Sequence, residues 1–210
     1  MAVFIPRLSM GMIYSMAYYT TWNAYWYSYR MPNCTAYAFG SFNERAHVSG
    51  LNYNWPTGNG CDWYVQAPGK NLQVGAVPAL GAAACWWYQD SHGDPSGHVG
   101  IVEAITYDSN NVPVSFVTSN SAYYRSDPDD PMSDAGTPTD AFPYFYLETV
   151  YMATKDHRDG HPEAYFQGFV YHPNYPPNTP VLQIDDLLIL LAQRKKRPRN
   201  ITIEGRKFHG

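Results

Sequence analysis

Three residues of the chain have side chains and a spacing that suit nucleophilic catalysis: Cys34, His98 and Asn120. In such a set the thiolate attacks a carbonyl carbon, the imidazole carries the proton to the leaving amine, and the amide orients the ring. The reaction would be hydrolysis of an amide or peptide bond. Because a single cysteine is more often an inert buried residue, this interpretation depends on the histidine and the asparagine that follow it.

The residues around Cys34 predict a helix that begins at the thiol. Pro32 is tolerated just outside a helix or in its first turn, where its missing N–H costs nothing. Asn33 is a good N-cap, because its side-chain oxygen accepts a hydrogen bond from an N–H group of that turn. The predicted helix covers residues 33–45, and the field at its positive end favours the thiolate form of Cys34.

The other two residues are predicted on an antiparallel hairpin. Residues 97–106 and 113–120 have the pattern of two strands joined by a turn. If Ser109 is the centre of the turn, His98 lies directly opposite Asn120 on one face of the sheet. The asparagine oxygen would then accept a hydrogen bond from one imidazole nitrogen and leave the other for the thiolate. A register shift of one residue would break this pairing.

The composition favours strands and turns over a helical bundle. The 210 residues include 19 Tyr and 6 Trp but only 15% charged residues, and they suffice for one domain with an appendage. Further elements are predicted in order along the chain: a short helix at 61–67, a buried strand within 77–87, a strand at 142–154, and a closing strand at 166–171.

The charge distribution is uneven. From Arg194 onward there are seven basic residues and one acid, which gives a charge of +6. Because the net charge of the whole chain is −4, the residues before Arg194 carry a charge of −10. The acidic body makes nucleic acid an improbable partner.

Residues 182–194 predict an amphipathic helix, which would dock on the domain, self-associate, bind a partner or touch an anionic membrane or wall polymer.

No metal or cofactor is expected. The three cysteines cannot form a closed disulfide set and do not have zinc spacing. Cys85 lies in an apolar run and is interpreted as a packing residue, and Cys61 as a small packed or half-exposed residue. No acid precedes Glu44, which excludes a calcium loop upstream of Cys34. The acidic residues of 125–141 and the histidines of 157–161 are better explained by a solvated loop and a polar turn than by a metal site.

The N-terminal residues predict neither a secretory signal nor a membrane span, because Pro6 and Arg7 interrupt the first apolar run. The Tyr- and Trp-rich residues 1–30 have two interpretations: a loop-rich arm packed over the domain, or an aromatic wall for a sugar-peptide ligand.

Five blocks of the sequence, in this order, resemble the CHAP family (cysteine, histidine-dependent amidohydrolase/peptidase): Asn33-Cys34-Thr35-Ala36-Tyr37, Gly58-Asn59-Gly60 with Trp63, Gly97-His98-Val99-Gly100-Ile101-Val102-Glu103, Thr118-Ser119-Asn120-Ser121, and Phe166-Gln167-Gly168-Phe169-Val170-Tyr171. The likeness spans roughly residues 20–172 and is greatest to phage endolysins and tail lysins. It implies a papain-like α+β fold, in which a helix with the cysteine packs on an antiparallel sheet that carries the histidine and the asparagine.

The resemblance also implies roles for individual residues. The family's nucleophile corresponds to Cys34, its general base to His98 and its orienting amide to Asn120. Many members carry a glutamate two residues before that asparagine, where this chain has Thr118, so a three-residue site is expected. The family blocks also supply our candidates for contacts with the substrate: Asn33, Tyr37, Trp63 and Thr118.

The resemblance implies cleavage of bacterial peptidoglycan, either by an endopeptidase or by an N-acetylmuramoyl-L-alanine amidase. The alternative is a non-catalytic virion or wall-binding protein that keeps the fold. The enzyme is expected in the host cytoplasm before release through a holin, or in the virion, where the C-terminal helix would bind tail or baseplate proteins. The predicted organisation is an aromatic arm at 1–19, a catalytic domain at 20–172, a Pro-rich linker at 173–181, and a helix with a basic tail at 182–210.

Overall fold

The computed structural model describes residues 4–7, 15–28, 31, 33–48, 54–89, 92–121, 146–156 and 165–177. All of them belong to the first of two compact units, Met1–Thr179 and Pro180–Gly210. The acidic loop, the histidines of 157–161 and the amphipathic helix predicted above lie outside the described residues.

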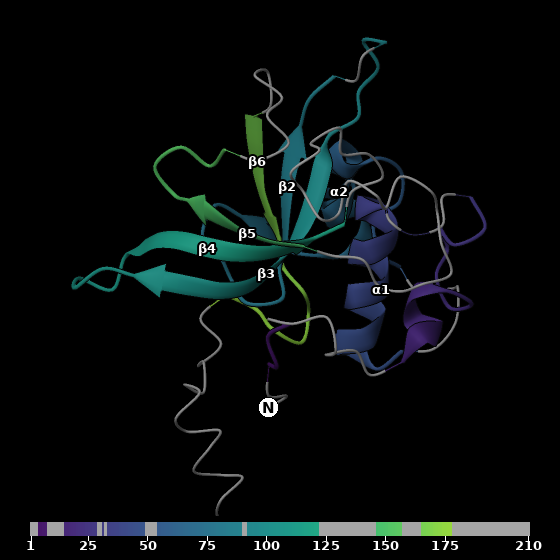
Figure 1. Cartoon of the computed structure of the whole chain (residues 1–210), viewed down its shortest axis with the longest axis horizontal. Helices are drawn as coiled ribbons and strands as arrows, with labels where there is room; N and C mark the ends of the chain where they lie inside the picture. Colours follow the sequence, from purple (N-terminus) through teal and green to yellow (C-terminus); the bar gives the residue numbers. More distant parts are fainter. Residues whose placement is uncertain are drawn as a thin grey trace, which may run out of the picture. The chain divides into compact units, whose positions relative to one another are not determined.

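Within these residues the chain combines helices with one antiparallel sheet (Figure 1). The helices are η1 (Met16–Tyr19), α1 (Cys34–Ala46), α2 (Gly60–Gln66) and η2 (Ala67–Lys70), and the strands are β1 (Val74–Gly75), β2 (Ala83–Trp87), β3 (His98–Tyr107), β4 (Pro113–Asn120), β5 (Tyr146–Tyr151) and β6 (Tyr165–Val170). The strand order is β1-β6-β2-β3-β4-β5. The predicted α+β fold, with a cysteine-bearing helix and an antiparallel sheet that carries the histidine and the asparagine, is therefore confirmed.

The predicted strand at 166–171 has the right place in the sequence and an unexpected place in the sheet. It forms β6, which lies between β1 and β2 in the interior and does not close an edge. Its pairing with β2 contains a bulge, because Cys85 pairs with Gly168 while Trp86 pairs with Phe166. An interior strand is hydrogen-bonded on both sides, so β6 holds two parts of the sheet together.

The β3–β4 register differs from the predicted one by two residues. Ile101 pairs with Ser119, so on the same register Asn120 lies opposite Gly100, and not opposite His98. Because successive side chains alternate between faces, a shift of two residues keeps Asn120 on the face of the sheet that carries His98.

The hairpin loop explains this shift. The main-chain N–H of Asp108 donates to the carbonyl oxygen of Val112 at 2.9 Å, so the loop is centred on Asn110 and not on Ser109. The Asp108 carboxylate accepts hydrogen bonds from the main-chain N–H groups of Asn110 and Val112, and Asn111 has a φ of 61°. Asparagine tolerates this left-handed conformation, which allows the longer loop to close.

Helix α1 is covered on almost every side. The side chains from Thr35 to Arg45 are buried, because the helix packs on β3 on one side and on η1 on the other. Figure 1 shows α1 between the sheet and the purple N-terminal segment. Asn23 of this segment donates a hydrogen bond from its Nδ2 atom to the carbonyl oxygen of Ala36 in α1, at 2.7 Å. The described part of residues 1–30 therefore packs over α1, and most of its aromatic rings belong to the core.

Two apolar clusters lie on opposite faces of the sheet. Cys85 and Val99 belong to the cluster that contains the rings of α1, whereas Trp86 and Val102 belong to the other. This division follows the alternation of side chains along β2 and β3. The sheet thus has a buried face with an apolar cluster on each side.

Candidate active site

Cys34 is the first residue of α1, as the sequence predicts. The extended backbone of Asn33 places its Oδ1 where it accepts hydrogen bonds from Ala36 N at 2.9 Å and Thr35 Oγ1 at 2.8 Å. The thiol side chain is half-buried. A cysteine in the first turn experiences the positive end of the helix dipole, which favours the thiolate needed for nucleophilic attack.

His98 and Asn120 form a direct hydrogen bond on the sheet. His98 Nε2 and Asn120 Oδ1 are 3.1 Å apart, and both side chains are buried. Asn120 Nδ2 donates to the carbonyl oxygen of Thr118 at 3.2 Å and to its Oγ1 at 2.9 Å, which fixes the orientation of the amide. Because a carbonyl oxygen only accepts, Nε2 carries the proton and Nδ1 is the basic nitrogen of the neutral ring.

Gly100 provides the space for this hydrogen bond. A Cβ atom built on Gly100 would overlap Oδ1 of Asn120. Because Asn120 lies opposite Gly100, its amide extends along the strand over the glycine and so reaches His98. The glycine two residues after the histidine is thus a necessary part of the site.

The directions of α1 and β3 place Cys34 and His98 at the same end of the domain. Arg45 Nη2 contacts both carboxylate oxygens of Glu103, at 2.8 and 2.9 Å. From Arg45 back to Cys34 the helix extends about 16.5 Å at its standard rise. From Glu103 back to His98 the strand also extends about 16.5 Å. Nearer to the thiol, Tyr37 contacts Ser119, the strand partner of Ile101, so helix and strand run in the same direction.

Two further glycines allow α2 to hold the start of β3. A Cβ on Gly60 would overlap the backbone of His98, and one on Gly97, whose φ is 85°, would overlap the carbonyl of Trp86. The main-chain N–H of Cys61 donates to the carbonyl oxygen of Ser96 at 2.9 Å. The second and third of the five sequence blocks therefore meet at His98, a contact that the sequence did not predict.

The ring of His98 also packs against its strand partner Trp86. Their ring centroids are 5.9 Å apart, and the indole of Trp86 is buried. Its Nε1 donates to the carbonyl oxygen of Lys155 at 2.8 Å, which fixes the plane of the indole. The imidazole is thus held by Asn120 at its Nε2 atom and by an apolar ring at its side.

A buried carboxylate joins α1 to the strand of Asn120. Glu103 accepts hydrogen bonds from Arg45, from the main-chain N–H of Arg7 at 2.7 Å and from Ser119 Oγ at 2.6 Å. Ser119 in turn accepts from the hydroxyl of Tyr37 at 2.9 Å. Burial raises the pKa of Tyr37, so this hydroxyl remains protonated and acts as a donor.

Arg7 extends this network to the N-terminal segment. Its guanidinium contacts the Glu44 carboxylate and the hydroxyls of Tyr19 and Tyr37, and Tyr19 donates to Glu44 at 2.7 Å. All four side chains are buried. The sequence interpretation used Arg7 only to exclude a signal peptide, and local pattern gave no indication of this long-range contact.

The part of the chain that contains this geometry matches a known family. Residues 19–120 match the family model of the CHAP domain. These residues form a CHAP domain. The match begins at the last residue of η1, includes Cys34 and His98, and ends at Asn120. No curated protein and no solved structure matches the chain.

CHAP domains are in general cysteine- and histidine-dependent amidohydrolases or peptidases, and the family suggests a hydrolase of peptidoglycan. Strands β5 and β6 lie outside the matched residues, although they belong to the same sheet as β3 and β4. The sheet that supports the histidine is therefore completed by residues beyond the family match.

The candidates for substrate contact have different surroundings in the CHAP domain. The side chains of Tyr37, Trp63 and Thr118 are fully buried, and only Asn33 is partly at the surface. Tyr37 and Thr118 contact Ser119 and Asn120. Tyr37 and Thr118 therefore support the strand of Asn120 from inside, whereas Trp63 packs against the ring of Phe42 in the core. That these residues contact a substrate stays a prediction.

The other two cysteines differ from Cys34 in their surroundings. Burial raises the pKa of Cys85, and the nearby thiols of Cys34 and Cys61 add to this effect. Burial and the neighbouring Asp62 raise the pKa of Cys61 as well. Both groups therefore favour the thiol over the reactive thiolate, in agreement with their interpretation as packing residues.

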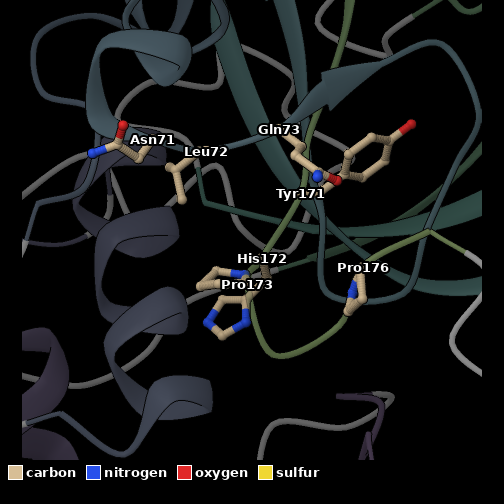
Figure 2. A pocket seen from close by; sticks show the side chains of 7 residues that line it. All are labelled: Asn71, Leu72, Gln73, Tyr171, His172, Pro173 and Pro176. Atoms are coloured by element: carbon tan, nitrogen blue, oxygen red, sulfur yellow. The ribbon is translucent and has the colours of Figure 1, made fainter.

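A small cavity of about 210 Å³ lies away from the thiol (Figure 2). Its lining includes His172, whose Nε2 contacts the carbonyl oxygen of Phe42 at 3.1 Å and whose Nδ1 accepts from Asn174 N at 3.2 Å. Burial lowers the pKa of His172 to about 3, so the ring is neutral. Phe42 is eight residues after Cys34, about 12 Å along the helix, which places this cavity at the opposite end of α1.

The described residues contain neither a cluster of metal-binding side chains nor a helix suited to span a membrane. Within residues 4–7, 15–28, 31, 33–48, 54–89, 92–121, 146–156 and 165–177, no three His, Cys, Asp or Glu side chains group as a metal site. In the same ranges no helix has the length and apolar character of a membrane span.

Proposed function

We propose that this chain is a cysteine-dependent peptidoglycan hydrolase of phage or prophage origin. Cys34 is the nucleophile, His98 the general acid and base, and Asn120 the residue that orients the imidazole. The observation that carries the proposal is the 3.1 Å contact between His98 Nε2 and Asn120 Oδ1, at the end of the CHAP domain where α1 begins with Cys34.

The first half-reaction forms a thioester. His98 Nδ1 takes the proton of the Cys34 thiol, and the thiolate attacks the carbonyl carbon of the scissile amide. The main-chain N–H groups of the first turn of α1 do not enter the hydrogen bonds of the helix itself, so the Cys34 N–H is suited to stabilise the oxyanion. The C–N bond then breaks as Nδ1 gives its proton to the leaving nitrogen, which departs as an amine.

The second half-reaction returns the enzyme to its starting state. His98 Nδ1 takes a proton from water, and the hydroxide attacks the thioester carbon. The C–S bond breaks, the product leaves as a carboxylic acid, and the thiolate regains a proton from the imidazole. The hydrogen bond to Asn120 stabilises the imidazolium that forms in both half-reactions.

Two bonds of peptidoglycan fit this chemistry: the amide between the muramoyl group and L-alanine, and a peptide bond of the stem or cross-link. The likeness of the five blocks to phage lysins supports an enzyme released from the host cytoplasm through a holin, or carried by a virion. In the virion form, the C-terminal segment would bind tail or baseplate proteins.

Digestion of purified peptidoglycan tests the proposal. Wild type should release fragments with new amino termini, detected by mass spectrometry, and their identity distinguishes amidase from endopeptidase. Cys34→Ala should release none, whereas Cys85→Ala should retain activity because it removes a buried thiol that is not in the site. Equal digestion by wild type and Cys34→Ala would contradict the proposal. A folded wild-type protein that binds the wall without products would favour a structural virion or wall-binding protein.

A further inference from the structure

Two aromatic rings are stacked where β2 ends and its antiparallel neighbour β6 begins. Trp87 and Tyr165 are strand partners, with ring centroids 5.3 Å apart and ring planes at 24°. Tyr165 is 55% exposed and Trp87 is half-buried. Within the described residues neither side chain makes a hydrogen bond. The ring of Tyr165 therefore presents an exposed aromatic face, and the half-buried ring of Trp87 is stacked behind it.

This pair lies at the end of the domain that carries the candidate nucleophile. Trp87 is two residues after Cys85 on β2, so both side chains point to the same face of the sheet, about 6.6 Å apart along the strand. Cys85 belongs to the apolar cluster on that face, and Cys34 packs against the same cluster. The neighbouring residue Trp86 pairs with His98. The two stacked rings are thus at the end of the domain where Cys34 and His98 lie.

The shape and chemistry of the surface indicate its ligand. A pyranose ring has one face of C–H groups and a rim of hydroxyl and amide groups. Such a face packs on an aromatic ring while its polar rim stays in water, and the stacked Trp87 holds the exposed Tyr165 ring in place for this contact. The stem peptides of peptidoglycan consist mainly of small and charged residues, which offer no flat apolar face of this kind.

We infer that the Trp87–Tyr165 pair is a subsite for a sugar ring of the glycan strand. This inference rests on the proposed function, because it assigns the glycan, the non-reacting part of the substrate, to a place in the same site. Binding the glycan beside Cys34 would hold the attached peptide near the thiol, so that remote binding energy orients the scissile bond.

A soluble oligomer of N-acetylglucosamine, which has no peptide, tests this subsite directly. The full-length chain is titrated with the oligomer, and binding is followed by intrinsic fluorescence. Trp87→Ala should weaken binding about tenfold, whereas Trp87→Phe should restore most of it because the aromatic face remains. Tyr107→Ala is the matched control, since Tyr107 is 44% exposed at the other end of β3 and should leave binding unchanged.

Hydrolysis separates this subsite from the proposed function. On peptidoglycan, Trp87→Ala should raise KM about tenfold with little change in kcat, because it removes binding and not chemistry. Cleavage of a glycan-free stem peptide should be unaffected. If wild type and Trp87→Ala bind the oligomer equally, or if wild type does not bind it, the subsite is wrong even where hydrolysis is intact. Oligomer binding lost only in Trp87→Ala, in a protein without hydrolytic activity, would support the subsite and contradict the proposed function.

Discussion

Asn120 reaches His98 by passing over Gly100, the residue that lies opposite it on β3. The hydrogen bond to Nε2 at 3.1 Å exists because Gly100 has no Cβ atom at the place that Oδ1 occupies. The pairing of these two proposed catalytic residues thus depends on a third residue that has no side-chain chemistry of its own.

Substitution of Gly100 by alanine should impair the enzyme through the position of Asn120. The added methyl group displaces the amide and leaves the imidazole without its partner, and a misplacement of this size costs about 100-fold in kcat. Peptidoglycan digestion rates measure the effect. Gly69→Ala is the control, because a Cβ there meets no atom within 4 Å, and it should retain full activity. Unchanged activity of Gly100→Ala would show that the Asn120 contact is dispensable.

The cap of α1 should contribute to both stability and reactivity. Asn33→Ala removes the acceptor for Ala36 N and should lower the free energy of unfolding by about 1 kcal/mol. It should also slow alkylation of Cys34 by iodoacetamide, because the first turn is less well formed. Urea unfolding and the alkylation rate are the measurements. Asn33→Asp keeps an acceptor at the same place and should retain the stability; a loss as large as that of alanine would contradict the role of the cap.

The buried carboxylate of Glu103 should be important for folding. Glu103→Ala leaves the guanidinium of Arg45 buried without its partner, which should destabilise the domain by about 3–5 kcal/mol in urea unfolding. The exposed Asp156 serves as control, and Asp156→Asn should change stability by less than about 0.5 kcal/mol. A small effect of Glu103→Ala would show that water or rearrangement compensates the lost ion pair.

His172 should make stability depend on pH below neutrality. Its pKa is about 3 in the folded chain, below its ordinary value of 6.5, so the unfolded chain binds the additional proton between these values. The stabilising effect is therefore complete above pH 6.5 and is lost as the pH falls toward 3. Between pH 6 and pH 4 the contribution decreases by about 1.4 kcal/mol per pH unit.

This contribution is isolated by comparison with His172→Gln. The variant should be less stable at pH 7 but should have a shallower decline of the unfolding free energy toward pH 4. His47→Asn replaces an exposed histidine at the end of α1, where asparagine tolerates the left-handed backbone, and should keep the wild-type slope. Equal slopes for wild type and His172→Gln would contradict the buried neutral ring.

Local sequence signals predicted the parts of the site that depend on local structure. The Pro32-Asn33-Cys34 run predicts the helix start because capping involves only neighbouring residues, and the structure has α1 begin at Cys34. The hairpin was predicted with the correct strands and a register wrong by two, since Asn111 takes a left-handed conformation that moves the centre of the loop. The shift was even, so the predicted partners of the hydrogen bond remained on one face.

Contacts between distant residues could not be predicted in the same way. Arg7 and Glu103 are 96 positions apart, and neither residue lies in a pattern that indicates the other. The close approach of Gly60 to His98 likewise depends on how α2 packs on β3, which no local period encodes. Packing of elements that are remote in sequence selects these contacts, and a single sequence contains no direct signal for them.

The interior position of β6 determines when the domain can become complete. Its partners β1 and β2 end 90 and 78 residues before β6 begins, so both must wait for it during synthesis. Pairing between such distant segments gives the domain a high contact order, and folding is correspondingly slow. A ribosome must therefore synthesise at least 170 residues before the sheet under α1 can close. Cys34 is therefore synthesised 136 residues before Val170, the last residue of that sheet.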